Sequence, residues 1–195
     1  MNGKMVLFGV LLTVAVLPAA GSLAVDVPSL AEAAGRYAVT PSSSIAFTVE
    51  QAGGGGIRGR FGQFSGTFDL RSGNLSGSTV SFELRPASVT TGQQRIDAFL
   101  RSGAVFDTEH FDRISFRSSR VEQTGPDTAR VAGTLTARGR SSAESFDVRL
   151  TGWTGRSISF DVQGRIFRSR YGMDVGTPIY SNVVQFDMRI EGRRR

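Results

Sequence analysis

The stretch Ile45–Glu50, with the sequence IAFTVE, alternates apolar residues with small or polar ones. Successive side chains of a β-strand point to opposite faces, so this period places Ile45, Phe47 and Val49 together on one face. Such a strand covers a core with its apolar face and meets water with the other. The stretch therefore predicts a strand of an antiparallel sheet.

The same period returns along the chain and gives eight segments in all. The apolar positions of the other seven are Phe64, Gly66, Phe68 and Leu70; Val80, Phe82 and Leu84; Ile114 and Phe116; Ala129, Val131 and Leu135; Phe146, Val148 and Leu150; Ile158, Phe160 and Val162; and Val184, Phe186, Met188 and Ile190. Turn residues separate most segments, as in Gly53–Gly56 and Gly125–Asp127. Closing such a sheet removes its exposed edges. We therefore predict an all-β fold, an antiparallel eight-stranded barrel rather than a sandwich.

One segment, Gln93–Phe106, departs from the strand period. Ile96, Phe99 and Leu100 fit helical spacing better than strand spacing. We expect a short helix packed across one mouth of the barrel. Asp97 and Arg101 are four residues apart, a spacing that stabilises the exposed face of a helix by a few tenths of a kcal/mol.

The first 24 residues are typical of an export signal. Lys4 precedes an apolar run, Met5–Leu17, and small residues follow up to Ala24. The alternative is an uncleaved anchor, because Met5–Val25 approaches the about 20 residues that span a bilayer. The interruption at Pro18–Ser22 favours cleavage, and hence a periplasmic protein.

These patterns predict four parts of the chain. They are a signal peptide at 1–24, a small-residue tether at 25–35, a barrel domain at 36–192 and a basic tail at 193–195. All basic residues after Lys4 are arginines, and the whole chain carries a formal net charge of +6. The arginines are scattered singly on polar strand positions, which indicates a solvated surface and argues against nucleic acid as a partner.

The composition argues against an enzyme. The chain has no cysteine, and His110 is its only histidine. A Ser-His-acid triad needs a histidine to move the proton, and His110 lies in a polar turn without any Gly-x-Ser-x-Gly motif in the chain. A zinc site needs three or four ligands. We therefore predict no catalytic residue and no metal site.

A GxGxxG pattern at Gly54, Gly56 and Gly59 could suggest a dinucleotide. A strand-like segment, Arg60–Leu70, follows the pattern, so no helix N-terminus is available to bind phosphate. We read the pattern as a hairpin. No cofactor is expected, apart from a bound isoprenoid or other lipid.

Four blocks of sequence, in this order, resemble the YceI-like family of lipid-binding periplasmic proteins. They are Gly59–Leu70, Ala87–Ser119, Val131–Gly139 and Arg165–Met173. The resemblance extends from Gly35 to Gly192. It implies a lipocalin-like barrel, export to the periplasm, and binding of a polyisoprenoid or comparable long-chain amphiphile in the lumen.

The chain departs from the family at several polar positions. Family members commonly begin Tyr-x-x-Asp-x-x-His-Ser, whereas Thr40 and Ser43 replace the acid and the imidazole here. Phe99 stands where a histidine is usual, and Arg170 where an aspartate is common. These changes affect polar contacts and leave the apolar lumen in place.

The resemblance and the strand period together predict a ligand site. The phenylalanines expected to line the lumen are Phe47, Phe64, Phe68, Phe82, Phe99, Phe116, Phe160 and Phe186. Arg95, Asp97 and Arg168 match polar positions of the family. We expect these three residues to form a network at the barrel mouth, which orients the helix or meets a ligand head group.

The leading hypothesis is a non-enzymatic periplasmic carrier for a long apolar ligand, such as a polyisoprenoid, a quinone tail or a similar lipid. The alternative is a filled barrel that serves as an envelope interaction module and docks on a membrane redox protein. The expected partners are therefore an apolar lipid and either a membrane surface or such a redox protein.

Cleavage of the signal is testable by intact-mass analysis of the exported protein. We expect a new N-terminus near Val25. Recovery of chains that retain Met1 in a membrane fraction would contradict this prediction.

Overall fold

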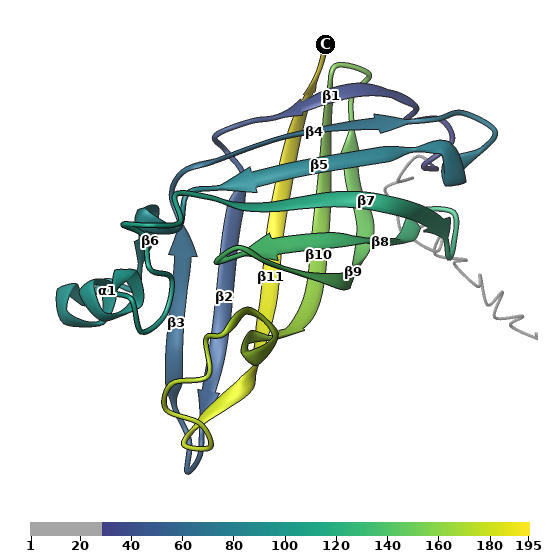
Figure 1. Ribbon diagram of the computed structural model, residues 1–195. Coiled ribbons are helices and arrows are strands. Elements are labelled where there is room, and N and C mark those ends of the chain that lie inside the picture. Colours follow the sequence, from purple (N-terminus) through teal and green to yellow (C-terminus); the bar gives the residue numbers. More distant parts are fainter. Residues whose placement is uncertain (1–28) are drawn as a thin grey trace, which may run out of the picture.

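The computed structural model describes residues 29–195, in which strands dominate (Figure 1). The strands are β1 Gly35–Val39, β2 Ser44–Gln51, β3 Gly56–Phe61, β4 Phe64–Leu70, β5 Thr79–Leu84, β6 Val89–Thr90, β7 Ile114–Gln123, β8 Thr128–Ala137, β9 Arg140–Trp153, β10 Ser157–Phe167 and β11 Tyr180–Arg194. The helices are α1, Gln94–Arg101, and the short 3-10 helices η1 Leu75–Gly77, η2 Pro86–Ser88 and η3 Arg168–Tyr171. The predicted signal peptide, 1–24, lies outside the described residues.

The sheet closes into a ring. Its strands follow the order β1, β4, β5, β7, β8, β9, β10 and β11, with antiparallel neighbours, and β1 pairs with β11. The ring has eight strands and leaves no unpaired edge strand. The predicted all-β, eight-stranded antiparallel barrel with one short helix is confirmed.

β11 makes the barrel wider at one end than at the other. Its residues Gly192–Arg194 pair with β1, whereas Tyr180–Arg189 pair with β2. β3 pairs with β2, and β6 with β3, so these strands extend the wall past the ring. We call this wider end the mouth. It is bordered by α1, the β2–β3 hairpin and the β10–β11 loop, Gly172–Ile179 (Figure 1).

A bend at Thr40–Ser43 joins β1 to β2 and is held by one residue of β11. The Ser43 hydroxyl donates to the Glu191 carbonyl at 3.2 Å and accepts from the Glu191 N–H at 2.9 Å. The Thr40 N–H donates to the same carbonyl at 2.8 Å. Two of the positions that depart from the family therefore hydrogen-bond the barrel wall.

The narrow end is closed around Tyr37. Its ring is fully buried and stacks on Phe68, with 5.2 Å between the ring centroids. The Tyr37 hydroxyl donates to the Ala33 carbonyl and accepts from Trp153 Nε1 at 3.1 Å. Arg194 lies over the Tyr37 ring at 5.3 Å. Arg194, predicted as part of a basic tail, thus belongs to β11 and helps close this end.

Residues just before β1 pack on the barrel. Leu30 and Ala33 are buried, and the Leu30 N–H donates to the Pro126 carbonyl at 2.9 Å. This segment falls within the range predicted as a tether, 25–35, yet its apolar side chains contact the domain. Within residues 29–195, no helix is long and apolar enough to cross a membrane.

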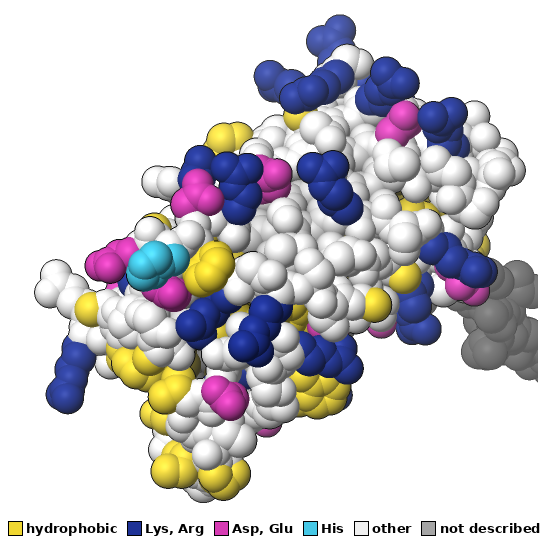
Figure 2. All heavy atoms as spheres, in the orientation of Figure 1, with side chains coloured by type: hydrophobic (Ala, Val, Ile, Leu, Met, Phe, Trp, Pro, Cys, Tyr) yellow, Lys and Arg dark blue, Asp and Glu magenta, His cyan; other side chains and the backbone are white. Residues whose placement is uncertain are grey.

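Most charged residues of the strands lie at outward positions, and the buried Glu144 on β9 is an exception. On β9, Asp147 and Arg149 are exposed, while Phe146 and Val148 between and beside them face inward. Figure 2 shows arginine side chains spread over the visible face, several beside acidic ones. Arg130 and Asp147 form one such exposed pair, at 2.8 Å.

Two neighbouring substitutions test which side chains of β10 face the barrel interior. Phe160 is buried and packs edge-on against Phe68, with centroids 5.6 Å apart, whereas Asp161 is exposed. Phe160→Arg buries an unpaired charge and should lower the free energy of unfolding by at least about 3 kcal/mol. Asp161→Arg should change it by no more than about 0.5 kcal/mol. Denaturant unfolding of both variants is the measurement, and equal stabilities would contradict the assigned register.

Candidate binding cavity

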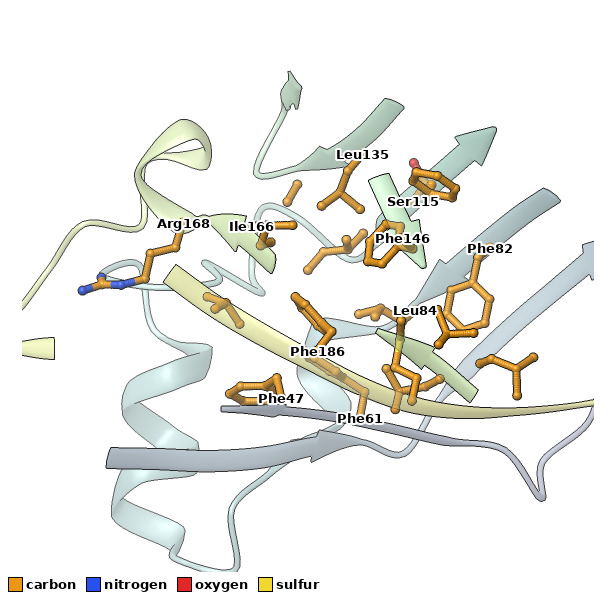
Figure 3. Close-up of a pocket in the computed structure, with 18 of the residues that line it drawn as sticks. Phe47, Phe61, Phe82, Leu84, Ser115, Leu135, Phe146, Ile166, Arg168 and Phe186 are labelled. Carbon is orange, nitrogen blue, oxygen red and sulfur yellow. The ribbon is translucent and has the colours of Figure 1, made fainter. Parts of the chain in front are cut away.

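The barrel encloses a cavity of about 540 Å³. Side chains from α1, β2, β3 and every strand of the ring line it. Figure 3 shows part of this lining, with Phe47, Phe82, Phe146 and Phe186 around the cavity. Almost all of the lining residues are apolar, and the polar residues among them are Thr67, Ser81, Arg95, Ser115, Arg168 and Tyr180. Such a lining favours an apolar occupant over water.

Several inward-facing side chains of the lining keep accessible surface. Phe82, Phe146, Val148, Phe186 and Met188 are only partly buried, although each alternates with outward residues on its strand. Side chains in a filled core would lose nearly all contact with a solvent probe. The accessible surface of these residues therefore faces the cavity.

Seven of the eight phenylalanines predicted to line the lumen do so: Phe47, Phe68, Phe82, Phe99, Phe116, Phe160 and Phe186. Phe64 does not. Its ring stacks on that of Phe82, with centroids 6.1 Å apart, and it borders a separate polar depression with Gln63 and Arg113. The strand period places Phe64 on the correct face, but Phe64 is the first residue of β4 and lies beside Phe82 rather than on the cavity.

Three further phenylalanines line the cavity that were not among the predicted site residues: Phe61, Phe106 and Phe146. Phe146 carries the strand period and was recognisable as inward-facing. Phe61 ends β3, and two residues separate it from the start of β4. Phe106 follows α1 and contacts Phe61 edge-on at 5.6 Å, a contact that no local pattern signals.

Arg168 is buried at the mouth, and its side chain holds the β10–β11 loop. Its guanidinium donates at 2.5–3.0 Å to the carbonyls of Met173, Val175, Tyr180 and Ser181 and to the Thr177 hydroxyl. Burial lowers the pKa of Arg168, and Asp174 opposes that shift. Figure 3 shows the guanidinium pointing away from the phenylalanines. The methylene groups of Arg168 thus border the cavity, while its guanidinium donates its hydrogen bonds to the β10–β11 segment.

Asp97 anchors α1 to the wall beside it. Its carboxylate accepts from the Thr91 N–H and hydroxyl, both at 2.7 Å, and from the Thr90 hydroxyl at 3.3 Å. The hydrogen bond from Thr91 is the main cause of a lowered pKa for Asp97. Arg101 donates to the carbonyls of Ala87 and Val89. Asp97 and Arg101 therefore attach the helix to β6, to Thr91 after it and to η2 before it.

The network predicted from Arg95, Asp97 and Arg168 does not form as a unit. Asp97 bonds threonines beside α1, and Arg168 bonds carbonyls of the β10–β11 loop. Arg95 lines the cavity and makes no hydrogen bond or ion pair with another described residue. The separation has a physical cause, because nearby backbone and hydroxyl groups already satisfy both buried charges.

His110 lies in the loop between α1 and β7. Its Nδ1 is 2.8 Å from Asp107 Oδ1, and this hydrogen bond raises the pKa of His110. The imidazole is mostly exposed. Within residues 29–195, no group of three His, Cys, Asp or Glu residues is placed to hold a metal ion.

A closed eight-stranded antiparallel barrel around an apolar cavity defines a lipocalin-like fold. The chain matches the YceI-like domain over residues 37–192 and therefore belongs to the YceI-like family. A relative in Vibrio campbellii, a UPF0312 protein, is 28% identical over 182 residues, which cover 89% of this chain and 95% of the relative.

Solved structures share the fold at lower identity. BcnA of Burkholderia cenocepacia superposes with a TM-score of 0.73 at 21% identity, over 78% of this chain and 98% of BcnA. A polyisoprenoid binding domain from Saccharophagus degradans superposes with a TM-score of 0.66 at 16% identity, over 83% of this chain and 99% of that domain.

The role of Arg168 is testable by Arg168→Met, with Arg165→Met near the end of the preceding strand, β10, as the control. The first change leaves several loop acceptors without a donor and should lower the free energy of unfolding by about 2–4 kcal/mol. Amide exchange within 173–181 should accelerate. Arg165 is exposed and makes no side-chain bond with another described residue, so its replacement should be near neutral. Unchanged exchange in Arg168→Met would contradict the assignment.

Proposed function

We propose that this protein is a non-enzymatic periplasmic carrier that holds a long apolar ligand in its lumen. The ligand class is a polyisoprenoid, a quinone tail or a similar lipid chain. The observation that carries the proposal is the cavity of about 540 Å³ with its almost entirely apolar lining. Ligand pockets in proteins commonly measure about 300–1,000 Å³.

Affinity for such a ligand comes from removing its methylene groups from water. Each buried methylene contributes up to about 0.8 kcal/mol, reduced by the cost of ordering the chain. The partly buried Phe82, Phe146 and Phe186 still have apolar surface to cover. A bound chain would remove its own apolar surface and that of the lining side chains from water at the same time. This binding needs no catalytic residue and no further cofactor.

The family relationship agrees with this ligand class. The Saccharophagus degradans domain, which shares the fold, is a polyisoprenoid binding domain. The export signal predicted at 1–24 supports a periplasmic location.

The alternative function, a filled barrel that docks on a membrane redox protein, needs inward side chains that occupy the whole lumen. The accessible inner surface of residues such as Val148 and Met188 disfavours it. The carrier is therefore the function that the geometry supports best.

Val148→Phe tests whether the lumen is available to a ligand. Val148 faces the cavity from β9 and is partly buried, so a phenyl ring there should occupy ligand space. We expect lipid occupancy, measured by native mass spectrometry, to fall severalfold. The free energy of unfolding should change by less than about 1 kcal/mol, because overpacking a filled core costs about 1–3 kcal/mol.

Val183→Phe is the matched control. Val183 neighbours Val184 on β11 and is not part of the lining, so the same atoms are added outside the cavity. Occupancy should stay at the wild-type level. A filled barrel predicts the opposite pattern, in which Val148→Phe loses stability and neither the wild type nor either variant carries lipid.

A further inference from the structure

The mouth carries the exposed large apolar side chains of the described residues. The exposed fractions are 45% for Phe99, 44% for Phe167, 41% for Val175 and 58% for Ile179. Phe99 lies on α1, Phe167 ends β10, and Val175 and Ile179 belong to the β10–β11 loop. We call these four residues the apolar rim.

The rim borders the opening of the cavity. Phe99 and Val175 also line the cavity, whereas Phe167 and Ile179 do not. The Ile179 carbonyl accepts from the Ala52 N–H at 2.9 Å, which fixes the loop to the β2–β3 hairpin. Figure 2 shows apolar side chains gathered toward the lower end of the molecule, where α1, this hairpin and this loop lie in Figure 1.

Arginines flank the rim. Arg95 on α1 and Arg58 on β3 are exposed, and neither makes a hydrogen bond or ion pair with another described residue. Arg170 lies over the Phe167 ring at 4.9 Å and pairs with Glu144 at 3.2 Å. Besides Glu144, acidic side chains on the elements that border the mouth include Asp174 in the loop and Glu50 on β2, which accepts from Gln185 at 3.0 Å.

We propose that the mouth docks on an anionic lipid bilayer, with the apolar rim in the headgroup region and the flanking arginines on lipid phosphates. Exposed apolar side chains beside unpaired arginines are what a peripheral membrane site requires. The orientation brings the cavity opening against the bilayer, so that a chain could pass between them. Transfer of a chain between the cavity and the bilayer rests on the proposed function, whereas docking on the bilayer does not.

Charge favours a bilayer over a second copy of this chain. Two mouths facing each other would bring Arg58 and Arg95 of both copies together, and like charges at an interface are costly. The rim also surrounds an opening instead of forming one flat patch. A deformable bilayer surface can cover such a rim without leaving the opening as a void.

Flotation with vesicles tests the docking surface. The variant is Phe167→Ser with Ile179→Ser, because neither residue lines the cavity and both are largely exposed. On equimolar phosphatidylcholine and phosphatidylglycerol, the wild type should bind, and the double variant should bind about tenfold more weakly. Its thermal unfolding and its lipid occupancy should match the wild type.

An arginine pair tests the electrostatic part. Arg58→Gln at the mouth should weaken binding to these vesicles about fivefold, the effect of one basic residue near an anionic surface. Arg117→Gln removes the same charge from an exposed position on β7, in the ring. It should have a much smaller effect, and binding to pure phosphatidylcholine should be weak for all proteins.

Three results would overturn the docking proposal. They are unchanged flotation of the double variant, equal losses for Arg58→Gln and Arg117→Gln, or rim-dependent dimerisation in place of vesicle binding. Failure of the carrier function has a different signature, because vesicle binding would then persist in a protein that never carries lipid.

Discussion

The pairing of one edge of β11 with two strands in succession determines the shape of this barrel. β1 pairs with Gly192–Arg194 and β2 with Tyr180–Arg189, so the strand next to β11 bends between them. The hydrogen bonds from Thr40 and Ser43 to Glu191 fix that bend. Past the bend, the β2–β3 hairpin and β6 extend the wall beyond the ring, which leaves one end narrow and the other wide.

The two ends have different chemistry as a result. At the narrow end, Tyr37, Trp153 and Arg194 form a connected cluster that closes the core. At the wide end, Arg168 and Asp97 use their charges to hold a loop and a helix in place. The phenylalanines between the ends then line a cavity without a charged group at its centre. An apolar chain fits this distribution, since its length would lie in the lumen and its end would reach the mouth.

The strand period predicted seven of the eight ring strands and most of the lining, because side-chain alternation is local and one face of each strand had to be buried. Phe47 and Phe186 illustrate this, since they face inward from paired positions on β2 and β11. The eighth predicted segment is β2, which extends the wall past the ring, whereas the ring strand β1 was not among the predicted segments. Hydrogen bonds to backbone carbonyls elsewhere in the chain produce no comparable pattern in the sequence. The sequence indicates that Arg168 is a polar site residue, but it does not indicate that the acceptors lie in the following loop. It also predicts the wrong hydrogen-bond partners for Asp97. Phe64 and Phe106 show that the strand face on which a side chain lies does not by itself determine whether the side chain lines the cavity. Its position along the barrel matters as well.

The central claim, that the lumen holds a long apolar ligand, is most directly tested on the wild-type protein purified from its own host without detergent. Native mass spectrometry before and after organic extraction measures what the barrel carries. The account predicts that extraction removes one lipid per chain, that the extract contains a long apolar molecule, and that the emptied protein takes up a polyprenol. Identical masses before and after extraction, together with no uptake of polyprenol by the folded protein, would contradict it.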